Sequence, residues 1–278
     1  MTFNPHAIPP LMASVLVLSL GFLVFRKHGG SIERLTFSWL CLTAFGWLFC
    51  YGIMQSVVDA STALLWARLG HSSVIFVPIA YIHFVRHSLK VPWLVRLYRP
   101  YYVIGIVSLG FMWTTDLYVR AVHKYWWGFY PRGGVVMVVD LSILIAAVLT
   151  AYGIFIARCW QVRKISSHEA NKLRYGCTAL TIFSIASLDF IPKLTSCAYY
   201  PLGFATTAAF VSMTTYAILK HRLMDMTIAI RKSLLYSVLI AGITVIYLLS
   251  VLLAEKLLPG MLGYQGLIAT VLAALVVA

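Results

Sequence analysis

A series of long, uninterrupted apolar runs constrains the fold of this chain more than any other feature. A helix needs about 20 apolar residues to cross roughly 30 Å of hydrocarbon, and eight runs of about this length are followed by part of a ninth. Strands of a membrane barrel would instead alternate with a period of two. The runs therefore predict an all-α, polytopic transmembrane bundle of about nine helices. They span approximately residues 8–25, 35–55, 64–85, 100–115, 135–157, 173–194, 199–219, 234–254 and 264 onward.

Composition agrees with a membrane location. Hydrophobic residues make up 61% of the chain, charged residues 11%, and the mean hydropathy is +0.88, outside the usual range of soluble domains. The net charge of +14 would suggest nucleic acid for a soluble protein, but Lys and Arg gather between the apolar runs. We expect the lipid bilayer, and no nucleic acid, as a partner. The five cysteines form no CxxC motif, so neither a zinc site nor a disulfide framework is indicated.

The distribution of basic residues predicts the topology. No Lys or Arg precedes the first run, whereas Arg26 and Lys27 follow it, the reverse of a cleavable signal peptide. Connections after the first, third, fifth and seventh runs carry sixteen Lys and Arg, and the intervening ones carry five. Because basic connections stay in the cytoplasm, we expect these richer connections inside and the N-terminus outside.

We divide the chain into three parts. Residues 1–222 are expected to form a seven-helix sensor bundle, 223–233 a cytoplasmic amphipathic connector, and 234–278 a further transmembrane hairpin. The last run has only about fifteen residues before Ala278, too few to span comfortably. We therefore expect a fragment of a longer protein that continues into the cytoplasm. The residues expected to frame the signal connector, near anionic headgroups, are Lys220, Arg222, Asp225, Arg231 and Lys232.

Ionisable side chains within the spans are candidates for function, because each costs about 2.5 to 3.5 kcal/mol at mid-membrane. Two pairs have helical spacing, three residues apart in one span and four apart in another, and both lie in the outer third of their helices. With aromatic residues of one external connection, they predict a pocket for a small polar ligand. The candidate residues are Arg68, His71, Trp126, Trp127, Tyr130, Asp140, Asp189 and Lys193.

A structural interpretation of the same residues stays open. Asp189 would then pair with Arg68 or Lys193 to hold helices in register, and the tryptophans would form an interfacial belt. His83 and His87 are four residues apart, but no span offers a matching histidine for haem or metal. We expect no cofactor, no metal and, in the absence of GxxxxGK[ST], GxGxxG, GxSxG or HExxH motifs, no catalytic residue in this chain.

Several stretches, taken in order, resemble a known family. The chain is similar to the N-terminal seven-transmembrane sensor region of bacterial histidine kinases, in the form with two additional transmembrane helices. The resemblance covers roughly the second to eighth spans. The stretches are LWARL at 65–69, WGFYP at 127–131, DFIP at 189–192, YPLG at 200–203 and YAILKHRLMDM at 216–226.

The resemblance implies a multi-pass sensory module of the bacterial inner membrane. It implies an external or membrane-borne signal, a homodimer formed through the full-length protein, and a cytoplasmic kinase domain that this chain lacks. Two alternatives remain from the residues alone. One is a transporter or channel, which would need a polar route through the whole bilayer, and the other is a structural subunit of a membrane complex.

Overall fold

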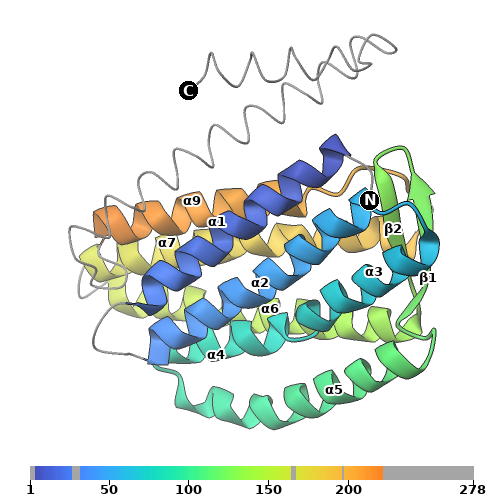
Figure 1. Ribbon diagram of the computed structural model, residues 1–278. Helices are drawn as coiled ribbons and strands as arrows, with labels where there is room; N and C mark the ends of the chain where they lie inside the picture. Colours follow the sequence, from blue (N-terminus) through green and yellow to red (C-terminus); the bar gives the residue numbers. More distant parts are fainter. Residues whose placement is uncertain (1–3, 27–31, 164–166, 196, 222–278) are drawn as a thin grey trace, which may run out of the picture.

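The computed structural model describes residues 4–26, 32–163, 167–195 and 197–221. Within these ranges the chain is mostly helical, with long helices that run back and forth and one small β-hairpin (Figure 1). We call each long helix, or each pair of helices that continue one another, a rod. The predicted connector 223–233 and both runs after it lie outside the described residues. The helices are α1 (Ile8–Phe25), α2 (Ile32–Ser56), α3 (Ala60–Val74), α4 (Val77–Leu89), α5 (Val95–Thr114), α6 (Val135–Arg163), α7 (Ser167–Ile185), α8 (Ile191–Leu194) and α9 (Gly203–His221).

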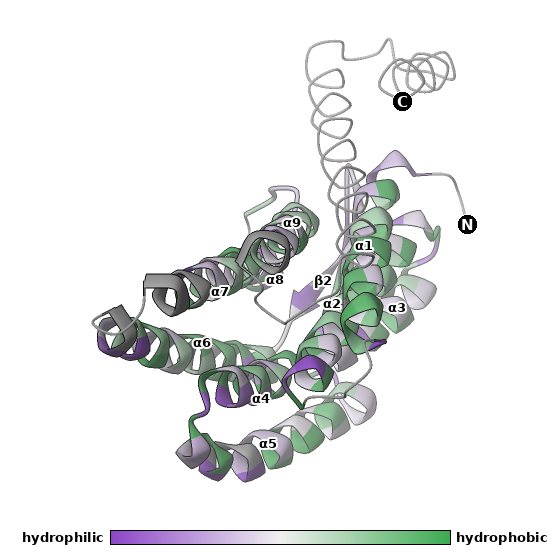
Figure 2. Cartoon of the chain, turned by 90° about the vertical axis from the view of Figure 1, so that its left-hand side faces the viewer, coloured by the Kyte–Doolittle hydropathy of each residue, from purple (hydrophilic) through white to green (hydrophobic). Residues whose placement is uncertain are grey.

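Five stretches of the described chain are long and apolar enough to cross a membrane, so this is a multi-pass membrane protein. Figure 2 shows green, hydrophobic residues along these helices, interspersed with paler ones. The third is a single rod of 30 residues made of α3 and α4, whose junction precedes Pro78. Proline lacks the backbone N–H that would continue the helix. The five stretches are Pro5–Phe25, Ile32–Ser56, Ala60–Leu89, Val135–Gln161 and Leu173–Leu194.

The rods contact one another in the cyclic order α1, α2, α4, α6, α7 and α9, and α9 returns to α1. α5 lies outside this ring and packs mainly on α4 (Figure 1). The ring encloses an apolar core in which side chains from α1, α2, α4, α7 and α9 meet, as ridge-and-groove packing of long helices requires. Its largest members include Leu20, Phe37, Tyr81, Phe183 and Phe210.

A β-hairpin covers one end of the bundle, and we call this the hairpin end. Strands β1 (Val119–Tyr125) and β2 (Gly128–Gly133) pair antiparallel. The two-residue turn between them is followed by Gly128. Its backbone φ of 131° is one that residues with a Cβ rarely adopt. Asn4 fixes this turn, because its amide donates to the carbonyls of Gln55 (2.7 Å) and Trp127 (2.8 Å). The sequence analysis did not predict this hairpin.

Candidate functional site

Asp189 lies where α7 changes its geometry at the hairpin end. The last turn before α8 is a 3-10 helix, η3 (Ala186–Phe190), which tightens the backbone ahead of Pro192. The Asp189 carboxylate is buried and accepts hydrogen bonds from the backbone N–H groups of Leu202 and Gly203, each at 2.9 Å. These groups start α9, where helical N–H donors have no partner within the helix. A negative charge at this position also interacts favourably with the positive end of the α9 helix dipole.

Tyr130 connects the hairpin to the same turn. Its hydroxyl donates to the main-chain carbonyl of Asp189 at 2.6 Å. Burial, with the Asp189 carboxylate adding to it, raises the pKa of Tyr130 well above its usual value, so the hydroxyl remains a donor at neutral pH. Strand β2, η3 and the start of α9 are therefore joined by hydrogen bonds at one residue.

Lys193 extends from α8 into the protein rather than toward solvent. Its side chain is buried, and the ammonium lies 4.3 Å from the ring centre of Phe190 and 5.5 Å from that of Tyr130. Such distances allow a cation–π interaction. Within the part of the chain that the structure describes, the Lys193 Nζ has no hydrogen-bond acceptor and no carboxylate oxygen within 4.0 Å, although it interacts electrostatically with the Asp189 carboxylate. A buried, charged donor of this kind is costly unless a further group satisfies it.

His71 of α3 faces the same space. Its Nδ1 lies 2.8 Å from the carbonyl oxygen of Ala67, so Nδ1 carries the proton and donates. The buried Nε2 is then an acceptor, and among the described residues it has no partner. One small cavity is lined by both His71 and Lys193, together with Tyr130 and, from α2, Trp47 and Tyr51. A cationic donor and an imidazole acceptor therefore line one small cavity.

The cavity is small. Its volume is about 10 Å³, close to the space that a single water molecule needs and far below the roughly 300 to 1,000 Å³ of typical ligand pockets. It suits a single polar group rather than a whole ligand of ordinary size. A group that accepts from Lys193 and donates to His71 would satisfy both side chains.

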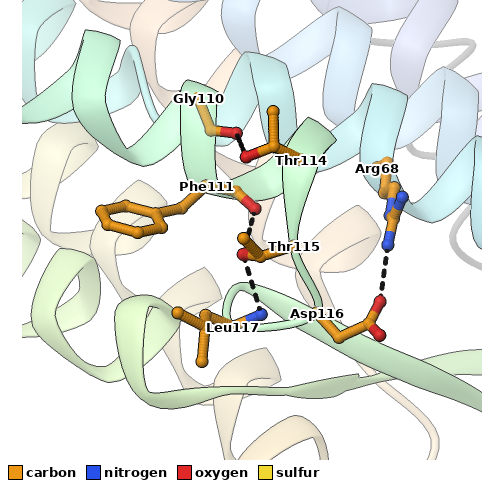
Figure 3. A network of polar contacts seen from close by, with 7 residues as sticks. All are labelled: Arg68, Gly110, Phe111, Thr114, Thr115, Asp116 and Leu117. Carbon is orange, nitrogen blue, oxygen red and sulfur yellow. Dashed lines mark hydrogen bonds and ion pairs between the residues drawn. The ribbon is translucent and has the colours of Figure 1, made fainter.

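Arg68 lies outside this cavity. Its guanidinium forms an ion pair with Asp116, in the segment that leads from α5 to the hairpin, at 2.9 Å (Figure 3). The Asp116 side chain is 76% exposed and that of Arg68 19%. The structure thus gives Arg68 a partner other than Asp189, and this partner was not considered in the sequence analysis.

We expect an Asp116→Asn variant to change the unfolding free energy by less than about 1 kcal/mol, because exposed ion pairs gain little net energy in water. Denaturant titration in detergent micelles measures this change. Arg120→Gln, a charge removal on the neighbouring strand, serves as the control. A loss above about 2 kcal/mol in Asp116→Asn alone would mean that the pair is a structural anchor.

The other three candidate residues lie in different surroundings. Asp140 of α6 accepts a hydrogen bond from Ser108 of α5 at 2.8 Å. Trp127 is fully buried and stacks on Tyr125 with ring centres 4.4 Å apart, whereas Trp126 is 65% exposed at the hairpin turn. The structure therefore brings together Asp189, Lys193, His71 and Tyr130, but not these three or Arg68.

The predicted signal connector is almost entirely beyond the described region. Lys220 belongs to the last turn of α9. Arg222, Asp225, Arg231 and Lys232 lie outside the described residues.

Two features near this site were not predicted from the sequence: the α2 side of the cavity, formed by Trp47, Tyr51 and Met54, and Gly203 at the start of α9. Trp47, Tyr51 and Gln55 are spaced by four, so they share one face of α2. This spacing, with a polar residue at its end, was the available signal. No sequence signal marks Gly203, because its role depends on the Trp47 side chain and the Asp189 carboxylate that lie against it in the fold.

The fold and this buried polar cluster define a multi-pass helical membrane protein with a polar cavity at one end of its bundle. Residues 9–227 match the family described as the N-terminal 7TM region of histidine kinase. The match covers most of the chain, so the chain belongs to this family, which is a membrane sensory region of histidine kinases. No curated protein and no solved structure matches the chain.

Proposed function

We propose that this chain detects a small ligand at the hairpin end of its bundle and passes a conformational change through α9 to a cytoplasmic output domain. The observation that carries the proposal is the position of Asp189. Its main-chain carbonyl accepts a hydrogen bond from Tyr130, which lines the cavity of Lys193 and His71. Its carboxylate accepts from the N–H groups at the start of α9. A ligand that shifts η3 would therefore act directly on the start of α9.

The chemistry of the cavity supports a ligand with a carboxylate or carbonyl oxygen and a nearby hydroxyl or N–H group. The oxygen would accept from Lys193, and the donor would face the Nε2 of His71. Because Lys193 is buried, its ammonium has lost most of its hydration, and an oxygen ligand regains that interaction. This differential contact is what a ligand needs to shift a two-state equilibrium.

The remaining parts of the proposal concern placement and assembly. The excess of Lys and Arg at the end opposite the hairpin supports a hairpin end outside the cell and an inner-membrane location. The same proposal includes the division into a sensor bundle of residues 1–222, a connector of residues 223–233 and a transmembrane hairpin of residues 234–278. So does a homodimer formed through the full-length protein, since family membership is consistent with a kinase.

The test is autophosphorylation of the full-length protein in native membranes. We expect Lys193→Met and Asp189→Asn to shift the phosphorylation level at least threefold from wild type. Methionine preserves most of the length of the lysine side chain without its charge, so the fold should tolerate it. Arg68→Ala is the matched control, because its ion pair lies outside the cavity, and it should stay within the wild-type range. Wild-type phosphorylation in both cavity variants would remove the cavity from the mechanism.

A further inference from the structure

A second, larger cavity lies deeper in the bundle, between α4, α6 and the end of α7. Its volume is about 220 Å³, somewhat below the roughly 300 to 1,000 Å³ of sites for drug-sized ligands. Close-packed interiors leave few voids larger than a water molecule, so a space of this size calls for an occupant. The candidate residues from the sequence analysis do not line it.

The walls of this cavity are almost entirely apolar. Tyr81 and Ser187 bring hydroxyl groups, while the hydroxyl of Ser184 already donates to the Leu180 carbonyl at 2.8 Å. Water is a poor occupant, because a buried water needs two to four polar partners. The main lining residues are Val74, Val77, Leu144, Val148, Phe183 and Phe190.

The mouth of the cavity opens on the side of α6. Ile145 and Leu149 line the cavity and are also 46% and 63% exposed. α6 is one of the membrane-crossing stretches, and only 22% of its most apolar window is buried in the protein. In a bilayer this exposed side faces hydrocarbon, so the occupant enters from the lipid phase and not from water.

We infer that this cavity between α4, α6 and α7 binds a lipophilic molecule dissolved in the bilayer, with an apolar chain or ring body and one hydroxyl or carbonyl group. The body fills the apolar walls, and the polar group meets the hydroxyl of Tyr81 or Ser187. Trp47 and Phe190 line its inner side. Trp47 also lines the polar cavity of Lys193, so this ligand touches the wall between the two cavities.

The inference is tested with a long-chain alcohol that carries a photoreactive diazirine, added to the full chain in phosphatidylcholine nanodiscs. Mass spectrometry should find adducts concentrated in residues 144–149 and 183–190. Excess unlabelled alcohol should lower them at least fivefold. Val148→Phe, which fills the cavity, should lower them equally, whereas Ile156→Phe, an exposed position of α6 outside the cavity, should not.

Ser187→Val provides a second variant, which narrows the opposite wall if Val148→Phe fails to fold. Adducts spread over all lipid-facing helices, without competition, would mean that ordinary lipid chains contact this face and would overturn the inference. Absence of adducts at the cavity would overturn it as well, because a second copy of the chain or another segment would then cover the mouth. The experiment measures binding, so its outcome is independent of the outcome of the phosphorylation test.

Discussion

An Asp189→Ala variant is expected to lose about 3 kcal/mol or more of unfolding free energy, because each buried N–H donor left without an acceptor costs roughly 1–3 kcal/mol. The carboxylate accepts from both Leu202 and Gly203, and it is only 3% exposed, so water cannot replace it. The variant also removes a carboxylate that interacts electrostatically with the buried Lys193. Titration with sodium dodecyl sulfate in mixed micelles, followed by circular dichroism, measures the loss.

Two further variants calibrate that result. Asp116→Ala removes the same side chain from an exposed ion pair and should cost no more than about 1 kcal/mol. Asp189→Asn should fall between the two, because the amide oxygen replaces only one of two acceptors. Equal losses in Asp189→Ala and Asp116→Ala would contradict the capping role that we assign to Asp189.

A Gly203→Ala variant is expected to destabilise the bundle by about 1–3 kcal/mol, the usual cost of extra volume in a packed core. A Cβ at this position would lie under 3.0 Å from both the Asp189 carboxylate and the Trp47 indole. The carboxylate cannot withdraw freely, since it holds the start of α9, and the bulky indole would have to move into one of the two cavities that it lines. The same micelle titration measures the change.

Gly153→Ala is the matched control for this substitution. Gly153 lies in the interior of α6, and a Cβ there would meet no atom within 4 Å. The alanine should therefore stabilise the helix by about 0.5–1 kcal/mol, through the lower conformational entropy of the unfolded chain. A loss at Gly153 as large as that at Gly203 would show that the effect does not come from the close approach of Trp47 and Asp189.

The helical rods were predictable because the bilayer permits so few alternatives. The run at 8–25 coincides with α1 (Ile8–Phe25), and the runs at 35–55 and 135–157 fall within α2 and α6. Long apolar segments must satisfy their own backbone in lipid, which makes each of them helical. Pro78 lies within the apolar run at 64–85, and the structure places the junction between α3 and α4 just ahead of it.

The hairpin was less predictable because strand preference depends strongly on neighbouring strands and burial. Its segment contains Arg120, Lys124 and Pro131, which are common in loops, and its apolar residues do not alternate strictly. What holds it is long-range: Asn4 binds its turn, and Arg132 donates to the carbonyls of Pro192 and Thr195.

Part of the candidate site followed from helical spacing. Asp189 and Lys193, four residues apart, were predicted to lie together, and they do lie at the same end of the bundle. The acceptor role of Asp189 toward α9 did not follow, because main-chain N–H groups carry no signature in the sequence. The Arg68–Asp116 pair was equally hidden, since Asp116 lies in a connection whose conformation depends on the hairpin.

The three hydrogen bonds at Asp189 also connect the β-hairpin mechanically to the bundle. A force applied to β2 would pass through the hydrogen bond from the Tyr130 hydroxyl to the Asp189 carbonyl. It would then reach the start of α9 through the hydrogen bonds that the Asp189 carboxylate accepts. All three bonds belong to one residue in a tight 3-10 turn, so a displacement of the hairpin is transmitted to α9 over a short distance. An antibody fragment or a crosslink that displaces the hairpin would thereby load α9 without entering either cavity.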